Sequence, residues 1–131
     1  MTASPDELEQ QYTLSTATTR YDDLRMRDAL AAMAGDHPDS LSKDEALEML
    51  ALSEVVIRKA GYGRQAMVRS ARATGASWTQ IGLALGSSKQ AAWESHTRWI
   101  EEQGRQHERT GYEGLDPAAA ARARESAGDL D

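Results

Sequence analysis

The segment spanning residues 77–100 constrains the fold of this chain more than any other, because it contains two helix starts separated by a helix stop. Ser77 and Gln80 are spaced for a capping box, in which the serine and glutamine side chains each bind the other residue's backbone N–H. Gly86 predicts the end of this first helix, since glycine readily adopts the left-handed conformation. Ser88 is a suitable N-cap for a second helix.

Apolar spacing within this segment indicates how the two helices pack. Ile81, Gly82 and Leu85 recur at helical spacing, so the first helix has a narrow apolar face with room for close approach. In the second helix one face carries Ala92, His96 and Trp99, and another carries Lys89, Gln90, Trp93, Glu94 and Thr97. Two helices joined by a short glycine-containing turn form a helix-turn-helix.

The residues of this segment resemble a known motif. Ile81-Gly82, Leu85-Gly86 and the run from Ser88 to Trp93 are similar to the helix-turn-helix of small bacterial DNA-binding regulators and of the promoter-reading region of sigma factors. Ala71-Arg72 and the run from Gly75 to Trp78 extend the likeness, particularly to small helix-turn-helix proteins of actinomycetes. It covers residues 64–100, and it departs from the family at Ser87, where an apolar residue is usual.

The resemblance implies a set of DNA-binding residues at the start of the second helix, which enters the major groove in these families. They are Ser88, Lys89, Gln90, Trp93, Glu94 and Thr97. A glutamine amide matches the adenine edge, and a lysine can serve guanine or a phosphate. The alternative for Lys89 and Gln90 is a solvated helix end. Trp93 is equally compatible with packing against a neighbouring helix. Glu94 could limit the choice of DNA sequence or be a surface charge.

Candidate phosphate contacts precede this helix. Arg64, Arg69 and Arg72 lie in the preceding helical segment, and Arg69 and Arg72 share a face because they are three residues apart. Solvation or an ion pair is the simpler explanation for each arginine alone. We also include Ser77, at the start of the first helix, among the candidate DNA-binding residues.

The charge distribution bears on this hypothesis. The chain has a net charge of −6, but residues 1–57 carry −8, residues 58–109 carry +5, and residues 110–131 carry −3. A basic middle between acidic ends is the asymmetry expected if only the middle meets phosphate. The alternative is an uneven but merely solvated surface.

The remainder of the chain is also expected to be helical. Ser4 and Pro5 predict a first helix start, the threonine-rich residues 13–19 predict a break, and a further helix should end at Gly35 before a loop over residues 36–39. Ser42 predicts the start of a long helix that reaches about Ala60.

This long helix has two apolar faces. One carries Leu47, Leu50, Val56 and Ile57, and the other Met49, Leu52 and Val55. Such a helix must be covered on two sides, and we expect the helix-turn-helix on one side and the amino-terminal helices or a second subunit on the other. The next helix, from Arg64 to Thr74, should turn Met67, Val68 and Ala71 inward and end at Gly75.

We therefore expect an all-α, multi-helix bundle containing a helix-turn-helix without a β-wing. Residues 1–42 would form a helical segment in which residues 5–35 cover the core or dimerise, residues 43–109 the DNA-binding domain, and residues 110–131 a mostly mobile acidic tail. A short alanine-rich helix from Pro117 to Ser126 has few large apolar residues to bury.

Other chemistry has little support in the sequence. There is no cysteine for a disulfide or thiolate metal site, and the three histidines are scattered. We therefore expect neither an enzyme nor a cofactor or metal, and we assign Trp78, Trp99 and His96 to the core. With no signal peptide or transmembrane run, a cytoplasmic, nucleoid-associated protein without membrane contact is expected.

These features predict a sequence-selective transcriptional regulator that binds double-stranded DNA as a homodimer, reading two half-sites about one helical turn apart. The alternative is a helical interaction module that binds a sigma factor, a polymerase or another protein partner through its long apolar helix.

Overall fold

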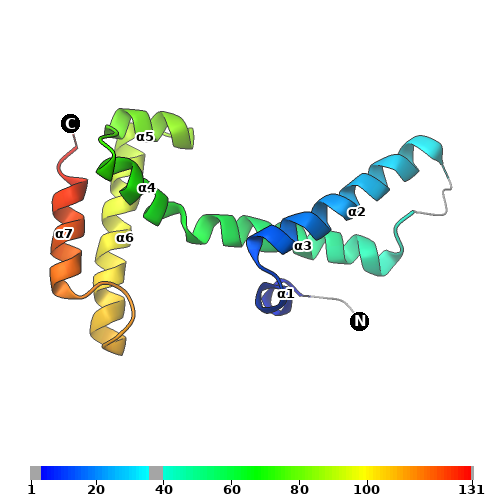
Figure 1. Cartoon of the computed structure of the whole chain (residues 1–131), viewed down its shortest axis with the longest axis horizontal. Coiled ribbons are helices and arrows are strands. Elements are labelled where there is room, and N and C mark those ends of the chain that lie inside the picture. Colours follow the sequence, from blue (N-terminus) through cyan, green and yellow to red (C-terminus); the bar gives the residue numbers. More distant parts are fainter. Residues whose placement is uncertain (1–3, 36–39, 131) are drawn as a thin grey trace. The chain divides into compact units, whose positions relative to one another are not determined.

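Residues 4–35 and 40–130 are described by the computed structural model, and within these ranges every regular element is a helix (Figure 1). The helices are α1 (Pro5–Gln11), α2 (Leu14–Ala34), α3 (Lys43–Tyr62), α4 (Arg64–Ala73), α5 (Trp78–Leu85), α6 (Lys89–Thr110) and α7 (Pro117–Ala127). The prediction of an all-α, multi-helix fold is confirmed. None of the helices in these ranges is long and apolar enough to cross a membrane.

The helices form two compact units, residues 1–63 and residues 64–131. The division at Gly63 differs from the expected boundary at residue 42, because α3 packs with α1 and α2 in the first unit. The α5–α6 pair packs with α4 and α7 in the second unit.

The start of α2 corrects the expected break over residues 13–19. Only Tyr12 and Thr13 interrupt the helices, and Thr13 is the N-cap of α2. Further on, the hydroxyls of Thr18 and Thr19 donate to the carbonyls of Leu14 and Ser15, at 2.7 and 3.0 Å. These hydroxyls bind carbonyls one turn back, so they are satisfied without breaking the helix. The helix ends at Gly35 as predicted, and the predicted loop over 36–39 lies outside the described residues.

The core of the first unit forms where α1 and α2 pack on α3. Its buried residues are Leu8, Ala17, Leu24, Ala51, Leu52 and Val55. Of the two predicted apolar faces of α3, the one with Leu52 and Val55 is buried, whereas Leu50 and Ile57 are 64% and 66% exposed. Only six buried residues form this core and two of them are alanines, so this unit buries little apolar surface for its length.

Ion pairs flank this core. Arg20 donates two hydrogen bonds to Glu48, at 3.0 and 2.9 Å, and Arg27 binds Glu45 at 2.7 Å. The bond from Arg27, together with the backbone N–H of Ser42, lowers the pKa of the Glu45 carboxyl to about 2. These pairs fix the register of α2 against α3.

The core of the second unit is built around Trp78. The buried apolar residues are Val68, Trp78, Ile81, Ala92, Ile100, Ala120, Ala123 and Ala127. Val68 faces inward as predicted, but Met67 is 60% exposed, since only one side of α4 is covered. Trp78 is fully buried and Trp99 packs against the same core.

The expectation of a mobile carboxy-terminal tail is wrong, because α7 is an ordered part of this core. Its alanines at 120, 123 and 127 are buried. The indole N–H groups of Trp78 and Trp93 donate to the carbonyls of Ala127 and Gly128, both at 2.9 Å. Small side chains let the α7 backbone approach closely, and the large indoles of the neighbouring helices supply the buried apolar surface.

Candidate nucleic-acid interface

A tight turn joins α5 to α6. Gly86 ends α5 in the left-handed conformation, with φ of 69°, and the N–H of Ser87 donates to the carbonyl of Gly82 at 2.8 Å. A β-carbon at Gly82 would lie 2.9 Å from the backbone nitrogen of Lys89 and 2.9 Å from the carbonyl oxygen of Ser87. The two helices therefore meet by backbone contact, as the small residue at 82 predicted.

Serine caps begin both helices. The Ser77 hydroxyl accepts from the N–H of Gln80 at 3.1 Å, and the Gln80 side chain accepts from the N–H of Ser77 at 2.9 Å. The Ser88 hydroxyl accepts from the N–H of Ala91 at 3.0 Å. In this role each serine still has its own hydroxyl proton to donate, so capping is compatible with a phosphate contact.

The first turns of α6 present a polar surface. Lys89, Gln90 and Glu94 are exposed, and the Gln90 amide donates to the Glu94 carboxylate at 3.0 Å. This bond uses one of the two N–H donors of the amide and leaves the other N–H as a donor and the amide and carboxylate oxygens as acceptors. In a major groove these acceptors match the amino groups of adenine and cytosine.

Two of the predicted site residues are turned toward α7. The indole of Trp93 is half-buried and hydrogen-bonded to Gly128, so it packs against a neighbouring helix. The Thr97 hydroxyl donates to the carbonyl of Glu94 at 3.0 Å. Both line a hollow next to the end of α7 that also contains Glu101, Glu125 and Asp129 together with Arg124. Mostly acidic side chains, with one arginine among them, therefore border the candidate interface on this side.

The three predicted arginines are not gathered around Gln90. The Arg72 guanidinium lies 5.1 Å from the centre of the Trp78 ring and donates to the carbonyls of Ala76, at 3.1 Å, and Ser126, at 3.4 Å. It therefore joins α4 to the end of α7.

The other two arginines are exposed on α4. The Arg69 guanidinium lies 5.8 Å from the centre of the Trp99 ring. Trp99 follows Gln90 by nine residues, about two and a half helical turns, and so lies on the opposite side of α6. Arg64 is exposed in the first turn of α4, where it borders an apolar hollow with Met67 and Leu85.

One further basic residue lies on the same side of α6 as the candidate interface. Arg98 is exposed, and it follows Glu94 by four residues and Gln90 by eight. Residues at this spacing lie along one side of a helix. The sequence carries this signal in the four-residue spacing of Gln90, Glu94 and Arg98.

The second unit contains a buried histidine. His96 is 1% exposed and contacts the rings of Trp78 and Trp99, with centroid distances of 5.6 Å to each. Its Nδ1 donates to the side-chain amide oxygen of Gln65 at 2.9 Å. Burial lowers the pKa of this imidazole, and the positive charges of Arg69 and Arg72 lower it further. The histidine is thus a core residue, as expected.

The formal charge of the second unit is balanced. Residues 64–131 carry nine basic and nine acidic side chains, whereas residues 1–63 carry six and twelve. The basic middle of the sequence is therefore divided between the two units. The net charge of the second unit would attract DNA only weakly. The positions of individual basic side chains therefore matter more for DNA binding than the net charge does.

No family model, no curated protein and no solved structure matches this chain. The geometry of the α5–α6 pair and the side chains that it exposes are consequently the observations that bear on function.

Proposed function

We propose that this protein is a sequence-selective regulator that binds double-stranded DNA by placing the first turns of α6 in the major groove. One observation carries the proposal. The turn at Gly86 and the backbone contact at Gly82 fix the start of α6 beside α5, and Lys89, Gln90 and Glu94 are exposed in its first turns. Recognition of base edges in the major groove requires polar side chains on exposed turns of a helix that its neighbours hold in place.

The chemistry of the exposed residues defines their roles in this proposal. The Gln90–Glu94 pair reads an adenine or cytosine amino group through its acceptor oxygens. Lys89 and Arg98 contact phosphates, which position the helix without selecting a sequence. Trp93 and Arg72 support the helix through α7 rather than touching DNA. Two copies of the chain would read two half-sites, and occupancy of such a site near a promoter would change transcription.

Selection from a random double-stranded DNA library with the purified full-length protein tests this function. We expect enrichment of a recurrent motif with two related half-sites. The matched control is the Gln90→Ala/Glu94→Ala double variant, which keeps α6 helical because alanine is a good helix former. It should enrich no motif, or one with relaxed preference at one position per half-site. Failure of the parental protein to enrich any motif at low salt would contradict the proposal.

A protein partner is the second candidate function, favoured by the exposure of Leu50 and Ile57 on α3. The same selection separates the two candidates, because a module that only binds protein yields no DNA motif.

A further inference from the structure

The α2–α3 hairpin has two sides, and α1 covers only one of them. Arg58 of α3 binds Asp6 of α1 at 2.8 Å and Glu9 at 3.2 Å, and the Tyr62 hydroxyl donates to Glu9. Leu8 of α1 is buried in the same core. The helix α1 therefore lies along the side of α3 that carries Arg58 and Tyr62.

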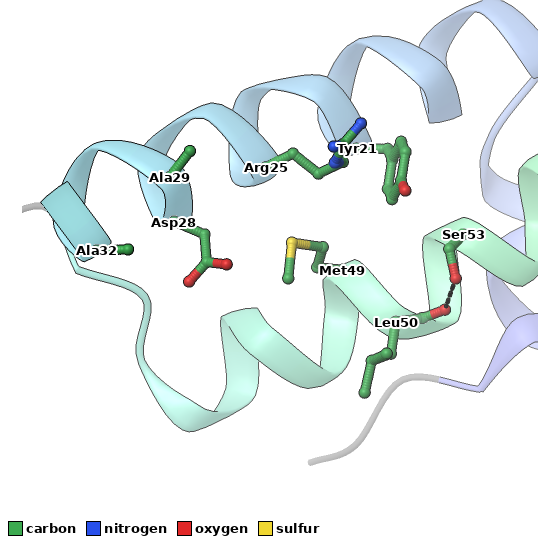
Figure 2. A pocket seen from close by; sticks show the side chains of 8 residues that line it. All are labelled: Tyr21, Arg25, Asp28, Ala29, Ala32, Met49, Leu50 and Ser53. Atoms are coloured by element: carbon green, nitrogen blue, oxygen red, sulfur yellow. Dashed lines mark hydrogen bonds between the residues drawn. The ribbon is translucent and has the colours of Figure 1, made fainter.

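No described residue of the first unit covers the other side of the hairpin. A hollow of about 270 Å³ lies there between α2 and α3 (Figure 2), and we call this surface the open side. It is lined by Tyr21, Arg25, Asp28, Ala29 and Ala32 of α2 and by Met49, Leu50 and Ser53 of α3. Ile57, two turns after Leu50, continues it along α3 and is also exposed.

We propose that the open side binds the open side of a second copy of this chain, so that two hairpins form a four-helix assembly. The small core supports this proposal. Two alanines and four larger aliphatic residues form the buried core cluster of the first unit, and a core of this size in a unit of about 60 residues gives marginal stability, to which oligomerisation can add. Covering Leu50, Met49 and Ile57 would add large apolar side chains to that core.

The dimensions of the hairpin suit such a dimer. Helices α2 and α3 contain 21 and 20 residues, so each is about 30 Å long. A face of this length and two helix diameters in width covers about 600 Å², near the roughly 800 Å² per partner of a standard stable interface.

The charges of the open side indicate a copy of itself as the occupant. Arg25 and Asp28 both line it, three residues apart on α2, and no ion pair joins either of them to another residue in the described part of the chain. In a two-fold dimer each patch meets itself, and antiparallel α2 helices bring Arg25 of each copy toward Asp28 of the other. A patch of one sign would repel itself, whereas this one is self-complementary.

Equilibrium sedimentation of the full-length protein, with matched leucine substitutions, tests the interface. We expect a dimer at tens of micromolar concentration. Leu50→Lys should produce a monomer, because it places charge in the centre of the open side. Leu30→Lys is the control: Leu30 is 56% exposed on α2, compared with 64% for Leu50, but does not line the open side. It should leave the dimer intact.

Charge reversal tests the identity of the occupant. Arg25→Asp and Asp28→Arg, each alone, should weaken dimerisation by about tenfold, because two attractive contacts per dimer become repulsive. The double variant restores opposite charges across a two-fold interface and should recover the parental dissociation constant. Both side chains are exposed, so these variants should keep the parental circular dichroism even where Leu50→Lys does not.

A parental monomer would overturn the proposal, as would equal disruption by Leu30→Lys and Leu50→Lys. A double charge variant weaker than either single variant would also overturn it, since that result fits a different partner on the open side. The inference does not depend on DNA binding, and each of its outcomes is measured without DNA.

Discussion

Gln90 and Glu94 lie one helical turn apart, and the hydrogen bond between them controls what the proposed interface offers to DNA. A free glutamine amide would present a donor and an acceptor to adenine. With one amide N–H donating to Glu94, the pair keeps one N–H donor and presents the amide and carboxylate oxygens as acceptors, which suit the amino groups of adenine and cytosine. In the proposed function Glu94 thus contributes to base choice, one of the roles that the sequence left open for it.

We predict that Gln90→Ala relaxes base preference at one position of each half-site. Loss of the acceptor should cost about 1–3 kcal/mol on the selected sequence and little on random DNA. The comparison is Arg98→Ala, which should weaken both complexes alike and reduce the salt slope by about one unit. Fluorescence anisotropy titrations over a range of salt concentrations measure both effects. Equal weakening of selected and random DNA by Gln90→Ala would show that it does not read bases.

We expect His96 to make the stability of the second unit depend on pH. Its pKa is lowered in the folded state, so below the ordinary histidine value of about 6.5 the unfolded chain binds a proton that the folded chain excludes. We predict that the free energy of unfolding decreases as the pH falls from about 7 to about 5.

Urea unfolding at the two pH values, followed by tryptophan fluorescence, measures this decrease. His96→Gln removes the titrating group and should reduce the pH dependence over this interval, whatever its effect on stability at neutral pH. An unchanged pH dependence in this variant would assign the effect to other residues.

At the scale of elements, the α5–α6 turn depends on one glycine more than on the others. Gly82 has a helical conformation, yet a β-carbon there would meet backbone atoms of residues 87–89 at 2.9–3.0 Å. Gly104, in the interior of α6, has no such atom within 4 Å. Substitutions at these two positions therefore separate the effect of close backbone approach from the general effect of glycine on helix stability.

We predict opposite results for alanine at these two positions. Gly82→Ala should destabilise the second unit by about 1–3 kcal/mol, because backbone atoms cannot move away as a flexible side chain can. Gly104→Ala should stabilise it by about 0.5–1 kcal/mol through improved helix propensity. Denaturant unfolding followed by tryptophan fluorescence provides both values, and a neutral Gly82→Ala would disprove the backbone contact.

At the scale of the whole molecule, the chain consists of two units with separate cores, and all three tryptophans, at 78, 93 and 99, belong to the second. Tryptophan fluorescence therefore reports on residues 64–131, whereas far-ultraviolet circular dichroism reports on the helices of both units. This distribution allows the stability of each unit to be measured in the intact protein.

We predict that the two signals do not coincide during thermal unfolding, because the small core of the first unit should unfold first. Raising the protein concentration should raise the midpoint of the first transition if this unit dimerises, since dissociation accompanies its unfolding. It should leave the fluorescence midpoint unchanged. Coincident transitions at every concentration would indicate one cooperative unit instead.

The sequence determined where most helices of this protein begin and end. The caps at Ser4, Ser42, Ser77 and Ser88 each accept a hydrogen bond from a backbone N–H three residues later. Such bonds need no partner from elsewhere in the chain, so local spacing identifies them. The cap at Ser88 also fixes where α6 begins, and the proposed base-reading residues in its first turns are the ones that the resemblance to helix-turn-helix proteins implies.

The tertiary structure decided which faces those helices bury. The sequence of α7 shows few large apolar residues, and its burial depends on Trp78, whose indole reaches a carbonyl 49 residues further along the chain. The sequence makes Arg72 a candidate phosphate contact, whereas its position beside Trp78 and Ser126 shows a packing role. The two apolar faces of α3 also look alike in sequence, and only the packing of α1 and α2 on α3 distinguishes the covered side from the open one. Helix caps are local, whereas burial is a property of pairs of segments that meet only in the folded chain.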